Sequence, residues 1–115
     1  MALSVPTSYD LILELSEALC LSVSEVGELL DIHPRTLQRR RRADELEDAE
    51  SLRAQMLSEV FSLARTVFGE TKRARAWLFG ELPELDFGRP VDQLGSIAGY
   101  ERVKRLLGQI AFGVY

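Results

Sequence analysis

The chain has 115 residues, of which 46% are hydrophobic and 28% are charged, and its formal net charge is −4. This balance is typical of one compact domain, or of two small helical units that share a core. The single cysteine excludes an internal disulfide, and no apolar run approaches the roughly 20 residues that a membrane span needs. The first residues lack the basic start of a signal peptide, so we expect a cytoplasmic protein without a membrane partner.

Apolar residues at helical spacing predict three short helices in the first part of the chain, over residues 8–20, 22–30 and 34–43. Ser22 and Glu25 have the spacing of a capping box, in which two side chains bond the free backbone N–H groups that begin a helix. Pro34 suits the first position of the third helix, because its missing N–H costs nothing there. The chain is therefore expected to begin as a cluster of short helices.

The longest helical pattern covers residues 45–68. Its first turn is acidic, which favours the positive end of the helix dipole, and Gly69 follows it as a helix stop. The apolar residues that we expect on its buried face are Leu46, Ala49, Leu52, Met56, Val60, Leu63 and Val67.

Shorter elements are predicted in the rest of the chain. A helix that starts at residue 71 ends at Gly80, and the loop that follows contains two prolines and two glycines. One or two helical turns are expected over residues 90–95, and a final helix over residues 97–115. The apolar face of that final helix consists of Tyr100, Val103, Leu107, Ile110 and Val114. Because no useful strand-like alternation is present, the chain is predicted to be all-α.

Residues 22–43 fit a helix–turn–helix, in which two short helices meet across a tight turn. Gly27 stands where a small residue in the first helix lets the second helix approach. Asp31 stands in the turn, where a left-handed backbone is needed, and aspartate tolerates that conformation better than most residues. Ile32 and Leu37 supply the apolar contacts of the turn and of the second helix.

The second of these helices is strongly basic. Residues 32–43 contain five arginines and no acid, although the whole chain is acidic, and such an asymmetry indicates a local electropositive face. Arginine can read guanine and glutamine can read adenine in the major groove, while Thr36 and the helix N-terminus can hold a phosphate. The predicted DNA-binding residues are Arg35, Gln38, Arg39 and Arg42, which share one stripe of the helix, and Thr36. The alternative for this stripe is a solvated charged face.

Arg40 and Arg41 do not share that stripe. They stand four residues before Asp44 and Glu45, which is the spacing of ion pairs along a helix. We therefore interpret these two arginines as partners in local salt bridges, each worth only about a few tenths of a kcal/mol.

The C-terminal half carries several short motifs in a fixed order, namely Trp77-Leu78, Pro83, Gly88-Arg89-Pro90, Leu94 and Gly113-Val114-Tyr115. Together with the upstream stretch "LDIHPRTLQRRR", they resemble the Xre/MbcA/ParS-type antitoxins from about residue 20 onward. The resemblance implies an N-terminal helix–turn–helix bundle packed with a small helical toxin-binding domain. The implied boundaries are residues 1–68, which include the long connecting helix, and residues 69–115.

The resemblance also implies a function. Such antitoxins belong to type II toxin–antitoxin systems and block the active-site pocket of a RES-domain toxin, which degrades NAD. They also bind their operator DNA and repress the operon. We therefore expect a DNA-binding repressor that forms a homodimer and a hetero-oligomer with its cognate toxin. The implied toxin-binding residues are Arg89, Pro90, Tyr100, Arg102, Phe112, Val114 and Tyr115.

Some of these residues allow two interpretations. Phe112, Val114 and Tyr115 stand at the end of the chain, where aromatic residues either anchor an interface or close the core of their own domain. Trp77 is expected in the core. Arg89 binds a carboxylate or caps backbone carbonyls, and the sequence does not decide between these roles.

Enzymatic activity is not expected. His33 lies in the turn of the helix–turn–helix, where capping or solvation is its expected role, and Cys20 has no neighbouring base and is expected to be a small buried thiol. No metal-ligand spacing and no glycine-rich phosphate loop are present, so we expect neither a metal nor a cofactor. Two other functions remain open: a stand-alone transcriptional regulator with a C-terminal dimerisation domain, and an interaction module whose helix–turn–helix no longer binds DNA.

Overall fold

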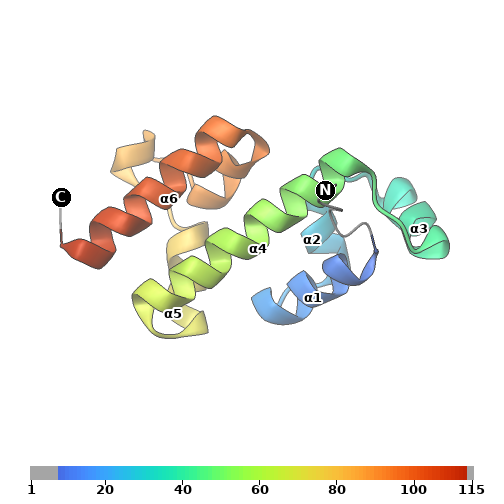
Figure 1. The fold of residues 1–115 in the computed structure, drawn as a ribbon, viewed down its shortest axis with the longest axis horizontal. Coiled ribbons are helices and arrows are strands. Elements are labelled where there is room, and N and C mark those ends of the chain that lie inside the picture. The colour runs from blue at the N-terminus through green and yellow to red at the C-terminus, as the bar shows by residue number, and fades with distance from the viewer. Residues whose placement is uncertain (1–7, 114–115) are drawn as a thin grey trace, which may run out of the picture. The chain divides into compact units, whose positions relative to one another are not determined.

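The computed structural model describes residues 8–113, and the regular elements within this range are helices. The prediction of an all-α fold is confirmed. The α-helices are α1 (Asp10–Leu19), α2 (Val23–Leu29), α3 (Pro34–Ala43), α4 (Asp48–Phe68), α5 (Thr71–Phe79) and α6 (Ile97–Phe112) (Figure 1). Two short 3-10 helices, η1 (Pro83–Leu85) and η2 (Pro90–Gly95), lie between α5 and α6 in the chain.

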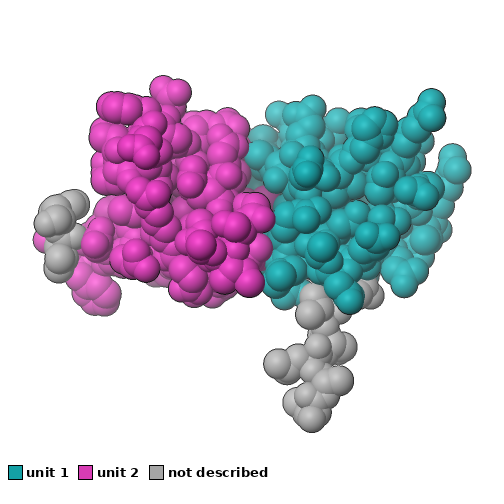
Figure 2. Space-filling view, turned by 90° about the horizontal axis from the view of Figure 1, so that it is seen from above, with its two compact units in different colours: residues 1–55 teal, residues 56–115 magenta. Residues whose placement is uncertain are grey.

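The chain forms two compact units, residues 1–55 and residues 56–115 (Figure 2). The boundary between them falls inside α4, so this helix contributes to both units. The boundary predicted after residue 68 separates a DNA-binding region from a toxin-binding domain. It is a division by function, which the compact units do not test, so it stays a prediction.

The first unit begins with α1, which buries Ile12, Leu15 and Leu19. These residues recur at helical spacing, so the burial of one stripe stabilises this segment as a helix. Cys20 ends the helix with a left-handed backbone (φ 55), and its N–H bonds a carbonyl of the last turn. Its side chain is exposed. The expectation of a buried thiol is therefore wrong, because Cys20 caps the helix and does not belong to the buried stripe.

Helices α2 and α3 form the predicted helix–turn–helix. The capping box is present, since Ser22 Oγ accepts the N–H of Glu25 and the Glu25 carboxylate accepts the N–H of Ser22, both at 3.0 Å. A Cβ atom on Gly27 would lie 2.9 Å from Cδ2 of the buried Leu37. The missing side chain therefore lets α3 approach α2. Asp31 has the left-handed backbone (φ 57) that the turn was expected to need.

Helix α4 begins at Asp48 and not at residue 45 as predicted. Helix α3 ends at Ala43, because the next residue, Asp44, has a left-handed backbone (φ 52) that turns the chain out of the helix. A short link then precedes α4. Leu46 lies in this link and is buried. The predicted start of α4 was too early, because Leu46 is a core residue of the link and not part of the helix.

The buried face of α4 also differs from the prediction in its first half. Ala49 and Leu52 were expected inside and are exposed, whereas Met56 and Val60 are buried as predicted. Leu63 and Val67, which were also expected on this face, are half-buried. The prediction assumed that Leu46 is the first residue of the helical apolar face. Since Leu46 precedes the helix, the residues three and six positions later, Ala49 and Leu52, do not lie on the buried face. The other buried residues of α4 are Glu50, Ser51, Ala54, Leu57, Phe61 and Ala64.

The second unit contains the predicted shorter elements. Gly69 (φ 83) follows α4 and Gly80 follows α5, as expected. A Cβ atom on Gly99 would collide with the carbonyl oxygen of Gln93, so only glycine allows α6 to lie this close to η2. The buried apolar residues of α5, η1, η2 and α6 include Leu78, Leu85, Val91, Leu94, Val103 and Leu107.

Helix α6 ends at Phe112, because Gly113 adopts a left-handed backbone (φ 66) whose N–H bonds the last carbonyls. The prediction of a helix through residue 115 is therefore wrong at its end. On its predicted apolar face, Val103 and Leu107 are buried, while Tyr100 and Ile110 are half-buried. Val114, the last member of that face, lies outside the described residues.

Candidate functional site

The exposed face of α3 carries the predicted DNA-binding side chains. Arg35, Gln38, Arg39 and Arg42 are exposed, and Thr36 is half-buried. Arg39 makes only a long hydrogen bond of 3.5 Å to Thr36 Oγ1. Within residues 8–113, none of these four exposed side chains forms an ion pair. The arginines of this stripe therefore keep their charge free for a partner, and their contact with DNA stays a prediction.

The N-terminus of α3 is capped by His33, whose Nδ1 accepts the backbone N–H of Arg35 at 3.2 Å. The expected capping role of this histidine is confirmed. Pro34 has no N–H and the N–H of Leu37 bonds the carbonyl of His33 at 2.9 Å, so among the residues of this first turn the N–H of Thr36 is left for a partner.

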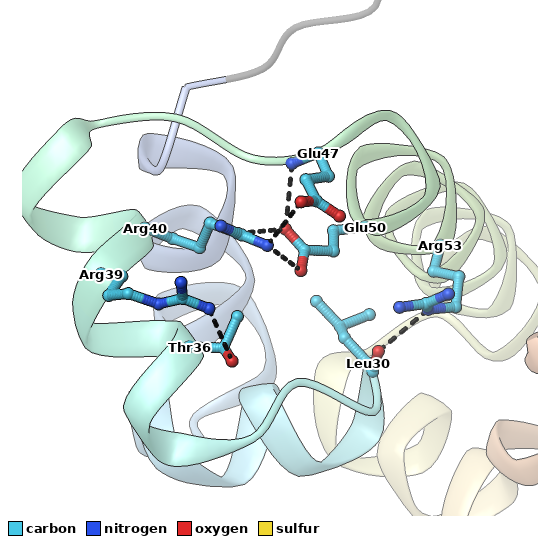
Figure 3. A network of polar contacts seen from close by, with 7 residues as sticks. All are labelled: Leu30, Thr36, Arg39, Arg40, Glu47, Glu50 and Arg53. Atoms are coloured by element: carbon cyan, nitrogen blue, oxygen red, sulfur yellow. Dashed lines mark hydrogen bonds and ion pairs between the residues drawn. The ribbon is translucent and has the colours of Figure 1, made fainter.

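Arg40 has a different environment from the stripe. Its Nε donates to Glu50 Oε1 at 2.7 Å and its terminal nitrogen donates to Glu50 Oε2 at 3.1 Å, and the same terminal nitrogen lies 3.0 Å from Glu47 (Figure 3). The side chains of Arg40 and Glu50 are only 17% and 8% exposed. This is a bidentate and largely buried ion pair, the strong form of this interaction.

The predicted partners of Arg40 and Arg41 are wrong. Asp44 instead accepts hydrogen bonds from Ser8 Oγ at 3.1 Å and from the N–H of Tyr9 at 3.2 Å, and so holds the start of the described chain. Its left-handed backbone takes it off the helical spacing that the prediction assumed. Arg41 is exposed and forms no ion pair in the described part of the chain.

Glu50 is held as a carboxylate by its surroundings. Burial acts to raise its pKa, but the hydrogen bonds from Arg40 and from the N–H of Glu47, together with the charges of Arg40 and Arg53, hold that pKa below the usual value. The N–H of Glu47 donates at 2.9 Å. Glu50 therefore caps the start of α4 and pairs with α3 at the same time.

Arg53, one turn further along α4, holds the other helix of the pair. Its Nε donates to the carbonyl oxygen of Leu30 at the end of α2 at 2.9 Å (Figure 3). The beginning of α4 thus contacts both α2 and α3. Sequence reasoning missed these two positions, although Glu50 stands three residues after Glu47 in the spacing of a capping box.

In the second unit, Arg89 forms a bidentate ion pair with Asp92, with distances of 2.8 and 2.9 Å. Its guanidinium also lies 5.8 Å from the centre of the Phe79 ring. Of the two roles left open for Arg89, the structure shows carboxylate binding. Pro90, the next predicted residue, is buried at the start of η2. Trp77, expected in the core, is half-buried and its ring lies 5.8 Å from that of Phe68.

Two further predicted toxin-binding residues have partners inside this unit. The Tyr100 hydroxyl donates to the Glu59 carboxylate, and Lys104 Nζ lies 3.4 Å from the same carboxylate. The hydrogen bond from Tyr100 lowers the pKa of Glu59, while burial and the carboxylate raise the pKa of Tyr100. Arg102 donates to the carbonyl oxygen of Glu84 at 2.6 Å. These contacts tie α6 to α4 and to η1.

The end of α6 exposes an aromatic side chain. Phe112 is 84% exposed, so of its two open interpretations the closing of the unit's own core is wrong. The remaining predicted residues, Val114 and Tyr115, lie outside the described range. Two further apolar side chains in this unit are strongly exposed and were not singled out from the sequence, namely Phe87 and Ile97.

Among residues 8–113, no cluster of His, Cys, Asp and Glu side chains could hold a metal ion. In that same range, no helix is both long and apolar enough to cross a lipid bilayer.

The fold and the exposed α3 define a helix–turn–helix protein with a second small helical unit. Residues 4–59 match the family model described as the antitoxin Xre-like helix-turn-helix domain. Residues 63–113 match the model described as the antitoxin Xre/MbcA/ParS C-terminal toxin-binding domain. The chain belongs to the Xre/MbcA/ParS antitoxins.

The chain is also similar to a solved structure described as the crystal structure of the M. tuberculosis MbcT-MbcA toxin-antitoxin complex. The match has a TM-score of 0.71 at 25% sequence identity and covers 93% of this chain and 96% of that chain. No curated protein matches the chain. The protein is thus an antitoxin of a toxin–antitoxin system, its partner is a toxin protein, and its family is not a catalytic one.

Proposed function

We propose that this antitoxin neutralises a cognate RES-domain toxin by blocking the active site in which that toxin degrades NAD. The observation that carries the proposal is the match of residues 63–113 to a toxin-binding domain. The exposed Phe112 at the end of that domain supports it, because large aromatic side chains are frequent anchors of protein interfaces.

The proposal assigns toxin binding to residues 69–115. Phe112, Val114 and Tyr115 would make direct contacts, as would the exposed parts of Arg89, Tyr100 and Arg102. Pro90 is buried, so its part in toxin binding would be to fix the backbone beside Arg89 at the start of η2. The internal bonds of Arg89, Tyr100 and Arg102 would hold the contact surface in a fixed shape, which lowers the entropy lost on binding.

The second part of the proposal is autorepression, with residues 1–68 binding the operator. Its support is the exposed stripe of α3, whose arginines have no ion pairs within the described residues. Bidentate contacts from Arg35 and Gln38 to base edges would give sequence preference. Arg39, Arg42 and Thr36 would hold phosphates. We infer a homodimer, because helix–turn–helix proteins commonly read paired half-sites.

Co-expression with the product of the neighbouring gene tests the first part. A tagged antitoxin should retain that protein through affinity purification and size-exclusion chromatography. If the neighbouring gene encodes no NAD-consuming toxin, or if no complex forms, the neutralisation proposal fails.

Binding to the DNA upstream of the operon tests the second part. The antitoxin should bind this DNA more tightly than unrelated DNA of equal length at the same salt concentration, because base contacts add to the phosphate term. Equal affinity for both DNAs would mean that the antitoxin binds without sequence preference, and this result would contradict autorepression.

A further inference from the structure

The segment that links α5 to η2 forms a closed loop with its own hydrogen bonds. The N–H of Leu82 donates to the carbonyl of Gly88 at 3.1 Å, and the N–H of Phe87 donates to the carbonyl of Leu82 at 2.8 Å. From α6, Arg102 donates to the carbonyl of Glu84 at 2.6 Å. These bonds hold the conformation of the loop without help from a partner.

Phe87 has a strained backbone within this loop. Its φ is 64 and that of the preceding Asp86 is 54, and a bulky residue at positive φ is an outlier. Glycine or asparagine adopts this conformation at lower cost. The loop does contain a glycine, but Gly88 stands one residue later, where a Cβ atom would lie 3.0 Å from the carbonyl oxygen of Leu85.

The side chain of Phe87 contributes little to the core of the unit. Phe87 is 66% exposed, whereas Leu85 in the same loop is buried. A residue that adds backbone strain and leaves its ring in water does not serve the stability of the unit. Strain that is held by surrounding bonds is concentrated at functional sites, where it fixes a side chain in advance.

We propose that Phe87 is an apolar anchor that inserts into a hydrophobic pocket of the cognate toxin. The residue lies inside residues 63–113, which match a toxin-binding domain, so the toxin is the occupant. Aromatic anchors in desolvated pockets contribute most of the binding energy of many interfaces. A ring already fixed in position also loses little conformational entropy on binding. This inference rests on the proposed neutralisation of a toxin.

The test separates stability from binding. Phe87→Gly and Phe87→Asn keep the left-handed backbone and remove the ring. Each should leave the Tm unchanged or raise it by about a few degrees, while the Kd for the co-expressed toxin rises about tenfold or more. Phe87→Tyr should bind within about threefold of the natural chain, because it retains the aromatic anchor.

Ile97→Ala provides the matched control, since Ile97 is 63% exposed in the same unit and begins α6. It should change the Kd by less than about twofold, as most exposed interface positions do. Unchanged toxin affinity of Phe87→Gly would overturn the inference, and so would an equal loss for Ile97→Ala. A natural chain that binds no toxin would instead refute the proposed function, so the two failures are distinguishable.

Discussion

At the scale of single residues, the four consecutive arginines of α3 have two different environments. Arg39, Arg41 and Arg42 are exposed and form no ion pair within residues 8–113. Arg40 is largely buried in a bidentate pair with Glu50. A buried pair of this kind costs most when one partner is lost, because the other remains as an uncompensated charge.

Glu50→Gln tests the importance of this pair. The substitution should lower the free energy of unfolding at pH 7 by about 1–3 kcal/mol, because a partly buried guanidinium loses its charged acceptor. The pKa of Glu50 is depressed in the folded protein from a usual value of 4.5. Its stabilisation is therefore fully present above about pH 4.5 and is lost as the pH falls through the folded pKa.

Thermal unfolding at pH 7 and at pH 3 measures this effect. The difference in Tm between Glu50→Gln and the natural chain should be clear at pH 7 and shrink at pH 3. Glu45→Gln serves as the control, because Glu45 is exposed and lacks an ion pair among residues 8–113. The same loss for both variants at pH 7 would contradict a special role of Glu50.

At the scale of elements, the helices and their ends were largely predictable. The capping box at Ser22, the small Gly27 and the left-handed Asp31 are local signals, and each has the predicted geometry. Gly69 ends α4 in the same way. The caps and the turn act within a few residues of the chain, and Gly27 belongs to a motif of fixed spacing that ends at Leu37, so a single sequence contains the information they require.

The partners across elements could not be predicted in the same way. Arg40 pairs with Glu50, which stands beyond the end of α3 on the next helix, and Arg53 reaches back to Leu30 at the end of α2. Helical spacing within one segment says nothing about such contacts. The positive φ of Phe87 could not be predicted from the sequence either, because the closure of the loop sets this angle and the residue type alone does not.

The basic face of α3 leads to a prediction at this scale. Arg42→Gln should reduce the slope of log K against log salt for operator DNA by about 1, because one phosphate contact is lost. Arg105→Gln removes an equal charge from an exposed position on α6 and should leave the slope unchanged. Fluorescence anisotropy over a series of salt concentrations measures both. Equal slopes for Arg42→Gln and the natural chain would remove Arg42 from the DNA-binding residues.

At the scale of the whole molecule, the long helix α4 contributes residues to both compact units. The beginning of α4 contacts α2 and α3 of the helix–turn–helix through Glu50 and Arg53. Further along, Glu59 bonds Tyr100 and Lys104 of α6 in the second unit. The match to a toxin-binding domain begins at residue 63, within the same helix. The chain therefore combines a helix–turn–helix and a toxin-binding domain in 115 residues.

The NAD content of cells that produce the neighbouring gene's toxin tests the central claim most directly. Toxin alone should deplete cellular NAD, and co-production of this antitoxin should preserve it, because the toxin's active site is blocked. The measurement is an enzymatic NAD assay on extracts taken before and after toxin induction, with equal toxin levels verified by immunoblot. NAD that falls equally with and without the antitoxin, or that the toxin does not deplete, would contradict the account.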